Sequence, residues 1–217
     1  DIPSTDTMVN LNLNFINNTG GGLAHIINLK TIYFQNNVFR EFPDFAITNR
    51  YTLTSIWLGM NQIERVCADK LLNMTKLKSI GLAFNNIRVF PDLHPVADTL
   101  EKLFMQSNAI TIIPRQNILC LKRLQLLDLR YNRLSAMPYI SSFNHVLVRL
   151  LLSGNPLTVI STEDMAALNG VDKVMLDSVA SLTTLPPVCY DEQTTIDITG
   201  SSIDLCDCSN AWIKPAL

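Results

Sequence analysis

The stretch Leu124-Gln-Leu-Leu-Asp-Leu-Arg-Tyr-Asn-Arg-Leu134 decides the fold of this chain. Its frame leucines lie three, two and five residues apart, at Leu124, Leu127, Leu129 and Leu134, which fits neither the 3.6-residue period of a helix nor the sustained alternation of a strand. Only Leu127-Asp128-Leu129 alternates as a short strand does, and Asn132 follows it where the chain must turn. The stretch therefore predicts one bent coil rather than a free-standing element.

The same frame recurs along the chain. Copies start at Leu29, Leu53, Leu77, Leu100, Leu124, Leu147 and Val171, in steps of 24, 24, 23, 24, 23 and 24 residues. Degenerate copies flank these, at Met8 (with Leu11 and Leu13) and at Gln193 (with Ile196 and Ile198). One coil buries only a few apolar side chains, at about 1.5–3 kcal/mol each, against about 1–2 kcal/mol for ordering each residue. Coils must therefore stack to be stable.

The pattern LxxLxLxxNxL resembles the leucine-rich repeat family, and the resemblance covers Met8 to Ile203. It implies an α/β protein, a curved leucine-rich repeat solenoid of about nine coils. A parallel β-sheet is expected on the concave face, with extended and short helical segments on the convex face. We assign residues 1–203 to this single domain and residues 204–217 to the start of a C-terminal cap.

An asparagine recurs at the turn of six successive coils: Asn37, Asn61, Asn85, Asn108, Asn132 and Asn155. Where the backbone leaves a strand and curves inward, its N–H and C=O groups lose their ladder partners. The asparagine side chain offers both a donor and an acceptor, so we expect this column to satisfy those groups coil after coil. Two copies depart from the rule, because Ile16 stands at the expected position in the first copy and Val179 in the copy at Val171.

The segments that return from one strand to the next are of two kinds. The copies at Leu29, Leu77, Leu124 and Val171 run into an apolar residue followed by proline, which predicts extended chain. The other copies return through apolar segments typical of a helical turn, at residues 68–77, 116–124 and 163–170. The first return segment instead contains Asn17-Asn18-Thr19-Gly20-Gly21-Gly22, which predicts a loop, and no phosphate-binding frame surrounds these glycines.

The five cysteines fall into two groups. Cys67 and Cys120 lie two coils apart, at least about 9–10 Å at the spacing of neighbouring strands, so both are expected to be free, buried thiols. Cys189, Cys206 and Cys208 lie within one coil of each other, and a disulfide from Cys189 to Cys206 or Cys208 is favoured over a zinc site. The Cys206-Asp207-Cys208 motif followed by Trp212 resembles the start of the cysteine-rich cap of extracellular leucine-rich repeat proteins. That resemblance makes Trp212 the candidate lid over the last coil.

Several features favour an extracellular location, secreted or on a cell-surface ectodomain. Asn17 and Asn73 each begin an N-glycosylation sequon, and these support the location implied by the cap. The chain begins at Asp1 without an initiator methionine, which suggests a mature or trimmed chain. The net charge of −2 gives no support for nucleic-acid binding, and no apolar run is long enough to insert into a membrane.

The sequence offers no constellation for catalysis. His25, His94 and His145 are scattered, and none belongs to a known catalytic or metal-binding motif. The carboxylates form no isolated pair. We therefore expect a protein that is not an enzyme and uses neither a metal nor another cofactor.

The candidate ligand-binding residues lie between the buried leucines, because successive side chains of a strand point to opposite faces. One column along the concave face includes Asn12, Asp128 and several large apolar residues, and a second, next to the turn, begins at Phe15. We predict that a protein or glycoprotein ligand contacts the apolar members of both columns: Tyr33, Trp57, Met60, Phe84, Phe104, Tyr131, Leu151 and Met175.

Cations border this surface where the strands begin, and they are suited either to an acidic partner or simply to solvent: Lys30, Lys78, Lys102, Arg149 and Lys173. The alternative for the aromatic residues is packing among themselves. The resemblance implies non-catalytic recognition by a receptor ectodomain, an immune-recognition protein or an adhesion protein. A structural protein of the extracellular matrix and an inhibitor of a secreted enzyme are the alternatives.

Overall fold

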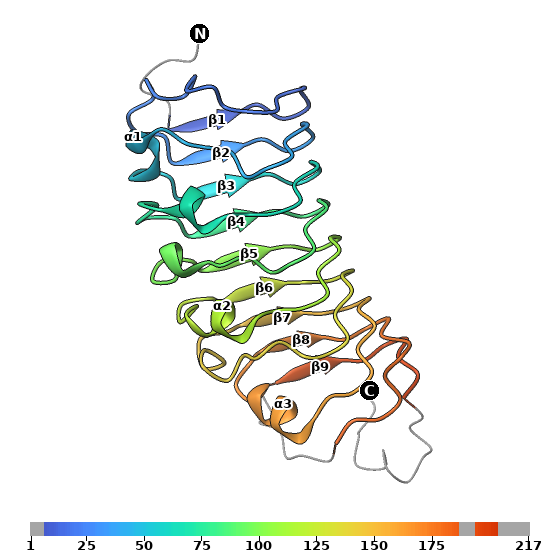
Figure 1. The fold of residues 1–217 in the computed structure, drawn as a ribbon. Coiled ribbons are helices and arrows are strands. Elements are labelled where there is room, and N and C mark those ends of the chain that lie inside the picture. Colours follow the sequence, from blue (N-terminus) through green and yellow to red (C-terminus); the bar gives the residue numbers. More distant parts are fainter. Residues whose placement is uncertain (1–6, 187–193, 204–217) are drawn as a thin grey trace.

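The computed structural model describes residues 7–186 and 194–203, and these residues form a stack of coils joined by one parallel sheet (Figure 1). Each coil contributes one three-residue strand, and the strands follow each other in chain order. They are β1 (Met8–Asn10), β2 (Thr31–Tyr33), β3 (Ser55–Trp57), β4 (Ser79–Gly81), β5 (Lys102–Phe104), β6 (Leu126–Asp128), β7 (Arg149–Leu151), β8 (Lys173–Met175) and β9 (Thr195–Asp197). The predicted leucine-rich repeat solenoid is confirmed.

The core lies between the sheet and the return segments. The middle residue of each strand points into it, so that Ile56 pairs with Ile80 and Leu103 with Leu127 in the same register. The frame leucines are buried with them; Leu124, Leu127 and Leu129 are fully inaccessible to solvent. Because each coil contacts the next through the same positions, apolar side chains fill the interior continuously from coil to coil.

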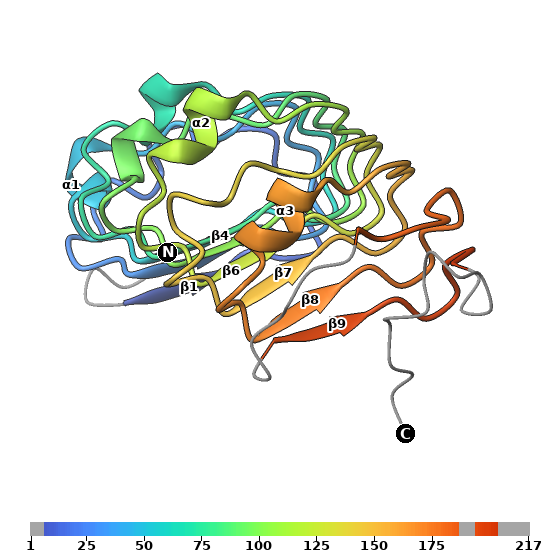
Figure 2. The same ribbon diagram turned by 90° about the horizontal axis from the view of Figure 1, so that it is seen from below.

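Short helices lie on the side of the coils away from the sheet (Figure 2). Three fall in or at the edge of the segments expected to be helical: η1 (Ala68–Leu71), α2 (Arg115–Leu119) and α3 (Thr162–Ala167). The last begins with a capping box, in which the Ser161 hydroxyl accepts the Asp164 N–H and the Asp164 carboxylate accepts the Ser161 N–H.

Two of the segments expected to be wholly extended are not. A helical turn follows Phe42-Pro43 as α1 (Ile47–Arg50), and another follows Phe90-Pro91 as η2 (His94–Val96). The prolines end the preceding extended segment, but apolar residues beyond them, such as Phe45 and Val96, must still be turned back onto the core. The sequence-based division into two kinds of return segment was therefore too sharp.

The first coil is shifted by two residues from its predicted frame. Val9 pairs with Ile32 and is buried, whereas Leu13 is 77% exposed. Asn10 therefore takes the position in the concave column that was predicted for Asn12. Leu13 takes the position next to the turn that was predicted for Phe15. Asn14 then occupies the turn position, and its Nδ2 donates to the carbonyls of Leu11 and Asn12. The assignment of Ile16 to the asparagine position was wrong.

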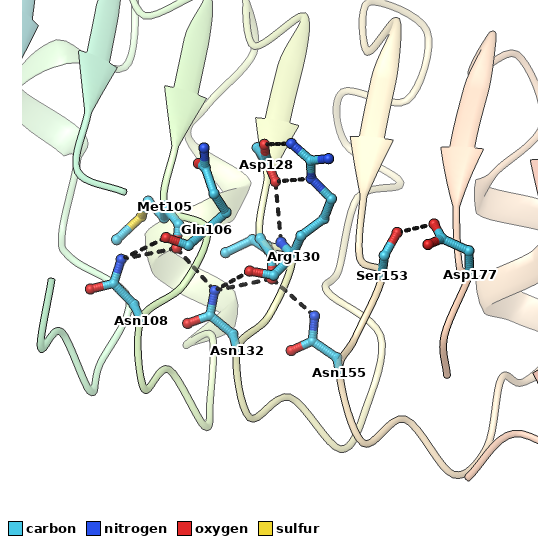
Figure 3. Close-up of polar contacts among 10 residues, drawn as sticks. Met105, Gln106, Asn108, Asp128, Arg130, Asn132, Ser153, Asn155 and Asp177 are labelled. Atoms are coloured by element: carbon cyan, nitrogen blue, oxygen red, sulfur yellow. Dashed lines mark hydrogen bonds and ion pairs between the residues drawn. The ribbon is translucent and has the colours of Figure 1, made fainter. Parts of the chain in front are cut away.

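The asparagine column forms the expected ladder (Figure 3). Asn132 is typical: its Nδ2 donates to the carbonyl of Leu129 in its own coil, at 3.0 Å, and to that of Met105 in the preceding coil, at 2.9 Å. Its Oδ1 accepts the N–H of Ile110 at 3.0 Å. Equivalent contacts to both coils are made by Asn37, Asn61, Asn85, Asn108 and Asn155. Each asparagine thus joins two coils.

The cysteines are only partly as expected. Cys67 and Cys120 are free thiols, but Cys67 is exposed and Cys120 is half-buried. Cys67 immediately precedes η1 on the outer surface, where its side chain is not covered by a neighbouring coil. Cys189, Cys206, Cys208 and Trp212 lie outside the described residues. Within the described residues, no helix combines the length and apolarity needed to cross a bilayer.

Candidate ligand-binding face

A column of residues with left-handed backbone runs along the exits of the strands. In each coil the residue before the ladder position has a positive φ, including Met60 at 56°, Phe84 at 56° and Tyr131 at 53°. This conformation costs an L-residue about 1–2 kcal/mol, and glycine adopts it most easily. Here it is imposed by the turn from the sheet into the ladder, and it occurs at predicted ligand-binding residues.

These side chains are also exposed. Met60 is 48%, Phe84 50% and Tyr131 56% accessible to solvent. The Tyr131 ring leans over the next coil, where Gly154 occupies the same column; a Cβ on Gly154 would lie 2.5 Å from Tyr131 Cδ1. The three form an apolar rim along one side of the sheet, as the sequence predicted.

Three aromatic rings form a strip along the middle of the sheet. The Trp57 ring stacks on Tyr33 with an interplanar angle of 9° and centroids 6.5 Å apart, and it lies 5.4 Å from the Phe104 centroid. Trp57 and Phe104 lie two coils apart, and Gly81 stands between them in the column. A Cβ on Gly81 would lie only 2.3 Å from Trp57 Cε3, so this glycine makes room for the indole.

We call Tyr33, Trp57 and Phe104 the aromatic strip. Its rings are half-buried because they cover one another. They pack among themselves, as the alternative expected, and they also keep part of their surface exposed, as the prediction of a binding surface expected. Farther along the column, Met175 is half-buried. Leu151 is only 8% exposed, which contradicts its predicted exposure. The column is therefore a weaker apolar surface beyond β6.

A polar group that was not predicted begins one coil beyond Phe104, where Asp128 pairs with it in the sheet. Figure 3 shows Asp128 with its partner Arg130. The Asp128 carboxylate is 2% exposed and accepts from Arg130 Nε at 3.0 Å and from Arg130 Nη2 at 2.7 Å. The hydrogen bond with Asp128 raises the pKa of Arg130, so the guanidinium stays charged. One coil on, the Ser153 hydroxyl donates to the Asp177 carboxylate.

This group has a signal in the sequence. Asp128 and Arg130 are two residues apart across the strand exit, a spacing that places both on one face of a sheet. The predicted ligand-binding residues come only from the two columns that contain large apolar residues. The column between them, which contains Gln106, Arg130 and Ser153, was therefore missed.

The predicted cations lie where expected, along the side where the strands begin. All five are exposed, and Lys78 Nζ contacts Glu101 Oε1 at 2.8 Å. Such a contact contributes about 0–1 kcal/mol to stability when it faces solvent. The cations are thus available to a ligand that approaches the aromatic strip.

A separate recess of about 470 Å³ lies on the flank beyond the asparagine ladder. It is lined mainly by polar and charged residues, among them Glu64, Arg88 and Arg133. None of the predicted ligand-binding residues lines it. We place the candidate site on the sheet, because the exposed apolar side chains and the aromatic strip are there.

The fold and this face define a leucine-rich repeat solenoid with an open concave surface. Residues 75–134, which include β4 to β6, match the family model described as leucine-rich repeat. No curated protein matches the sequence.

Solved structures of leucine-rich repeat proteins have the same fold. A leucine-rich repeat protein of Leptospira interrogans has a TM-score of 0.66 and 20% identity, over 88% of this chain and 48% of its own. Toll in the Toll–Spatzle complex of Drosophila has a TM-score of 0.70 and 19% identity, over 91% of this chain and 28% of its own. TLR13 in its complex with ssRNA13 has a TM-score of 0.62 and 19% identity, over 82% of this chain and 32% of its own. This chain spans from over a quarter to about half of these proteins, and the similarity establishes the fold.

Proposed function

We propose that this chain is a non-catalytic recognition module that binds a protein or glycoprotein on its concave face, as part of an extracellular receptor ectodomain, an immune-recognition protein or an adhesion protein. The observation that carries the proposal is the exposure of Met60, Phe84 and Tyr131 beside the aromatic strip. Large apolar side chains that gather on one face are typical of a partner site.

The residues that occupy this column in other coils strengthen the argument. The turn into the ladder imposes the left-handed backbone in every coil, and Ser107, Gly154 and Ser178 show that the turn does not require a large apolar side chain. Packing gives no reason for a half-exposed phenylalanine at residue 84.

The comparisons support a protein partner. Toll was solved in complex with Spatzle, and that complex is a molecular hub in Drosophila development and innate immunity. TLR13 was solved with single-stranded RNA, so nucleic acid is the second candidate for the ligand. The extracellular location is supported by the exposure of Asn17 and Asn73, the two candidate glycan acceptors.

Site-specific photo-crosslinking tests the proposal. Benzoylphenylalanine replaces Phe84 in one variant and Ile112 in a control, because Ile112 is exposed on the outer side of the ladder. Both variants are exposed to the extracellular fluid and surface membranes of the source organism. We expect a crosslinked protein from position 84 and none from position 112.

Crosslinking only from position 112 would instead support the structural or matrix role, in which the sides of the solenoid mediate assembly. A secreted enzyme crosslinked at position 84 would support the inhibitor alternative. Crosslinks to RNA alone would replace the protein ligand with nucleic acid.

A further inference from the structure

The Oε1 atom of Gln106 is buried and has no hydrogen-bond partner. Gln106 lies two residues after Phe104, at the edge of the aromatic strip, and Arg130 occupies the same position one coil farther on. Buried acceptors without a partner are rare. The Gln106 side chain as a whole is only half-buried, so rotation of its terminal amide would present this oxygen to a ligand that donates an N–H.

Arg130 presents a guanidinium that is already held in place. Asp128 engages Nε and one Nη2 proton, which leaves the two Nη1 protons and the second Nη2 proton for another acceptor (Figure 3). The side chain is 33% exposed, while the Asp128 carboxylate below it is almost inaccessible. An arginine fixed in this way is well suited to a carboxylate, because planar paired contacts need little further ordering.

We propose that the ligand bound by this face is an acidic peptide segment of a protein. An apolar or aromatic side chain contacts Trp57 and Phe104, a main-chain N–H donates to Gln106 Oε1, and a carboxylate accepts from Arg130. This inference rests on the proposed function and names the chemistry of its ligand.

The spacing of the three groups fits a short peptide. Phe104 and Arg130 belong to neighbouring coils, whose strands lie about 4.8 Å apart, and an extended peptide advances about 3.3 Å per residue. The carboxylate is therefore expected within three residues of the apolar anchor. Lys78 and Lys102, at the beginning of the adjacent strands, add attraction for an acidic segment.

A peptide fits this face better than single-stranded RNA. A nucleic-acid strand that continued from the aromatic strip toward β9 would pass Asp177 and Asp197. These carboxylates oppose a chain of phosphates, which is bound mainly by cations. A single carboxylate on a peptide, in contrast, needs only one cationic partner on the face, and Arg130 provides it.

The test is a selection of random 12-residue peptides displayed on phage, with the whole folded chain as target. We expect enriched peptides to contain an aromatic or large aliphatic residue with Asp or Glu within three positions. Affinities of enriched peptides are then measured by fluorescence polarisation against the parent chain and three variants.

Each variant isolates one contact. Asp128→Asn with Arg130→Gln removes both charges together, because loss of Arg130 alone would leave a buried carboxylate unpaired. Trp57→Ser with Phe104→Ser removes the apolar contact. Arg133→Gln is the control, an exposed arginine on the flank. Circular dichroism verifies that each variant is folded.

We expect the Asp128/Arg130 variant to bind about tenfold or more weakly, as loss of a charged hydrogen bond implies. A peptide in which the acidic residue is changed to its amide should bind the parent chain more weakly by the same factor. The Asp128/Arg130 variant should bind the acidic peptide and its amide form with equal affinity. Arg133→Gln should bind as the parent does.

Other outcomes overturn the inference in distinguishable ways. If peptides lose affinity in the Trp57/Phe104 variant but show neither an acidic residue nor dependence on Arg130, the face binds peptides of another chemistry and only this inference fails. If no peptide is enriched over the target-free control, or if binding is independent of both variants, the peptide inference fails, and crosslinking from position 84 still decides whether the face binds a folded protein or glycoprotein. Displacement of the peptides by a uridine 12-mer at lower concentration would indicate nucleic acid.

Discussion

Replacement of Asn108 by alanine tests how the ladder holds neighbouring coils together. In the parent chain, Asn108 Oδ1 accepts the N–H of Ile87 at 3.0 Å. Its Nδ2 donates to the carbonyls of Leu82, at 2.9 Å, and of Met105, at 3.0 Å. The substitution removes all of these contacts, but they do not contribute equally.

The two carbonyls keep another asparagine. Leu82 still accepts from Asn85 Nδ2 at 3.0 Å, and Met105 from Asn132 Nδ2 at 2.9 Å. The Ile87 N–H loses the ladder acceptor and gains no substitute. We therefore expect Asn108→Ala to lower the free energy of unfolding by about 1–3 kcal/mol, the cost of one unsatisfied buried group.

The shared carbonyl predicts coupling between neighbouring asparagines. In Asn108→Ala/Asn132→Ala, Met105 loses both of its side-chain donors, so the double variant should be less stable than the sum of the single effects by at least about 0.5 kcal/mol. Asn155 shares no carbonyl with Asn108, since it donates to Leu129 and Leu152. Asn108→Ala/Asn155→Ala should be additive within about 0.5 kcal/mol.

Urea unfolding followed by circular dichroism measures these free energies. A single transition must be verified for each variant, because stacked repeats sometimes unfold in steps. The reasoning is refuted if Asn108→Ala unfolds within error of the parent. It is also refuted if the adjacent pair is as additive as the separated pair.

Three further predictions concern the concave face and the thiols. Gly81→Ala should destabilise the chain by about 1–3 kcal/mol and displace the Trp57 ring; an unchanged emission spectrum in a Trp212→Phe background would contradict this. Gln106→Met should stabilise the chain by about 1 kcal/mol, because it removes a buried acceptor without a partner; a lower urea midpoint would show that this oxygen is satisfied in solution. Cys67 should react faster with N-ethylmaleimide than Cys120, whose thiol is half-buried and has a pKa raised by that burial; equal labelling in peptide mass maps would contradict the assignment.

The repeat positions allowed the coils to be predicted from the sequence, because a leucine and an asparagine recur where a core and a turn require them. The same logic failed at the first coil. Val9, Leu11 and Leu13 alternate, so the pattern alone allows two registers that differ by two residues. The structure selects Val9 because Asn14 then enters the ladder.

The candidate face was harder to predict. Alternation identifies which side chains leave the core, but it does not show which of them cover each other. Leu151 is buried although it belongs to the concave column, and Trp57 extends over Gly81 to reach Phe104. Both facts depend on the sizes of neighbours one or two coils away. The Asp128–Arg130 pair was within reach of the sequence, since two residues separate its members.

Chemical-shift mapping of a bound peptide measures most directly whether the open face of the sheet is the recognition surface. The isotope-labelled chain is titrated with a peptide enriched from the phage library. The account predicts that the largest amide shifts fall in β2 to β6 and at residues 106 and 130. Largest shifts in α1, η1, η2 and α2, on the opposite side of the coils, would contradict it.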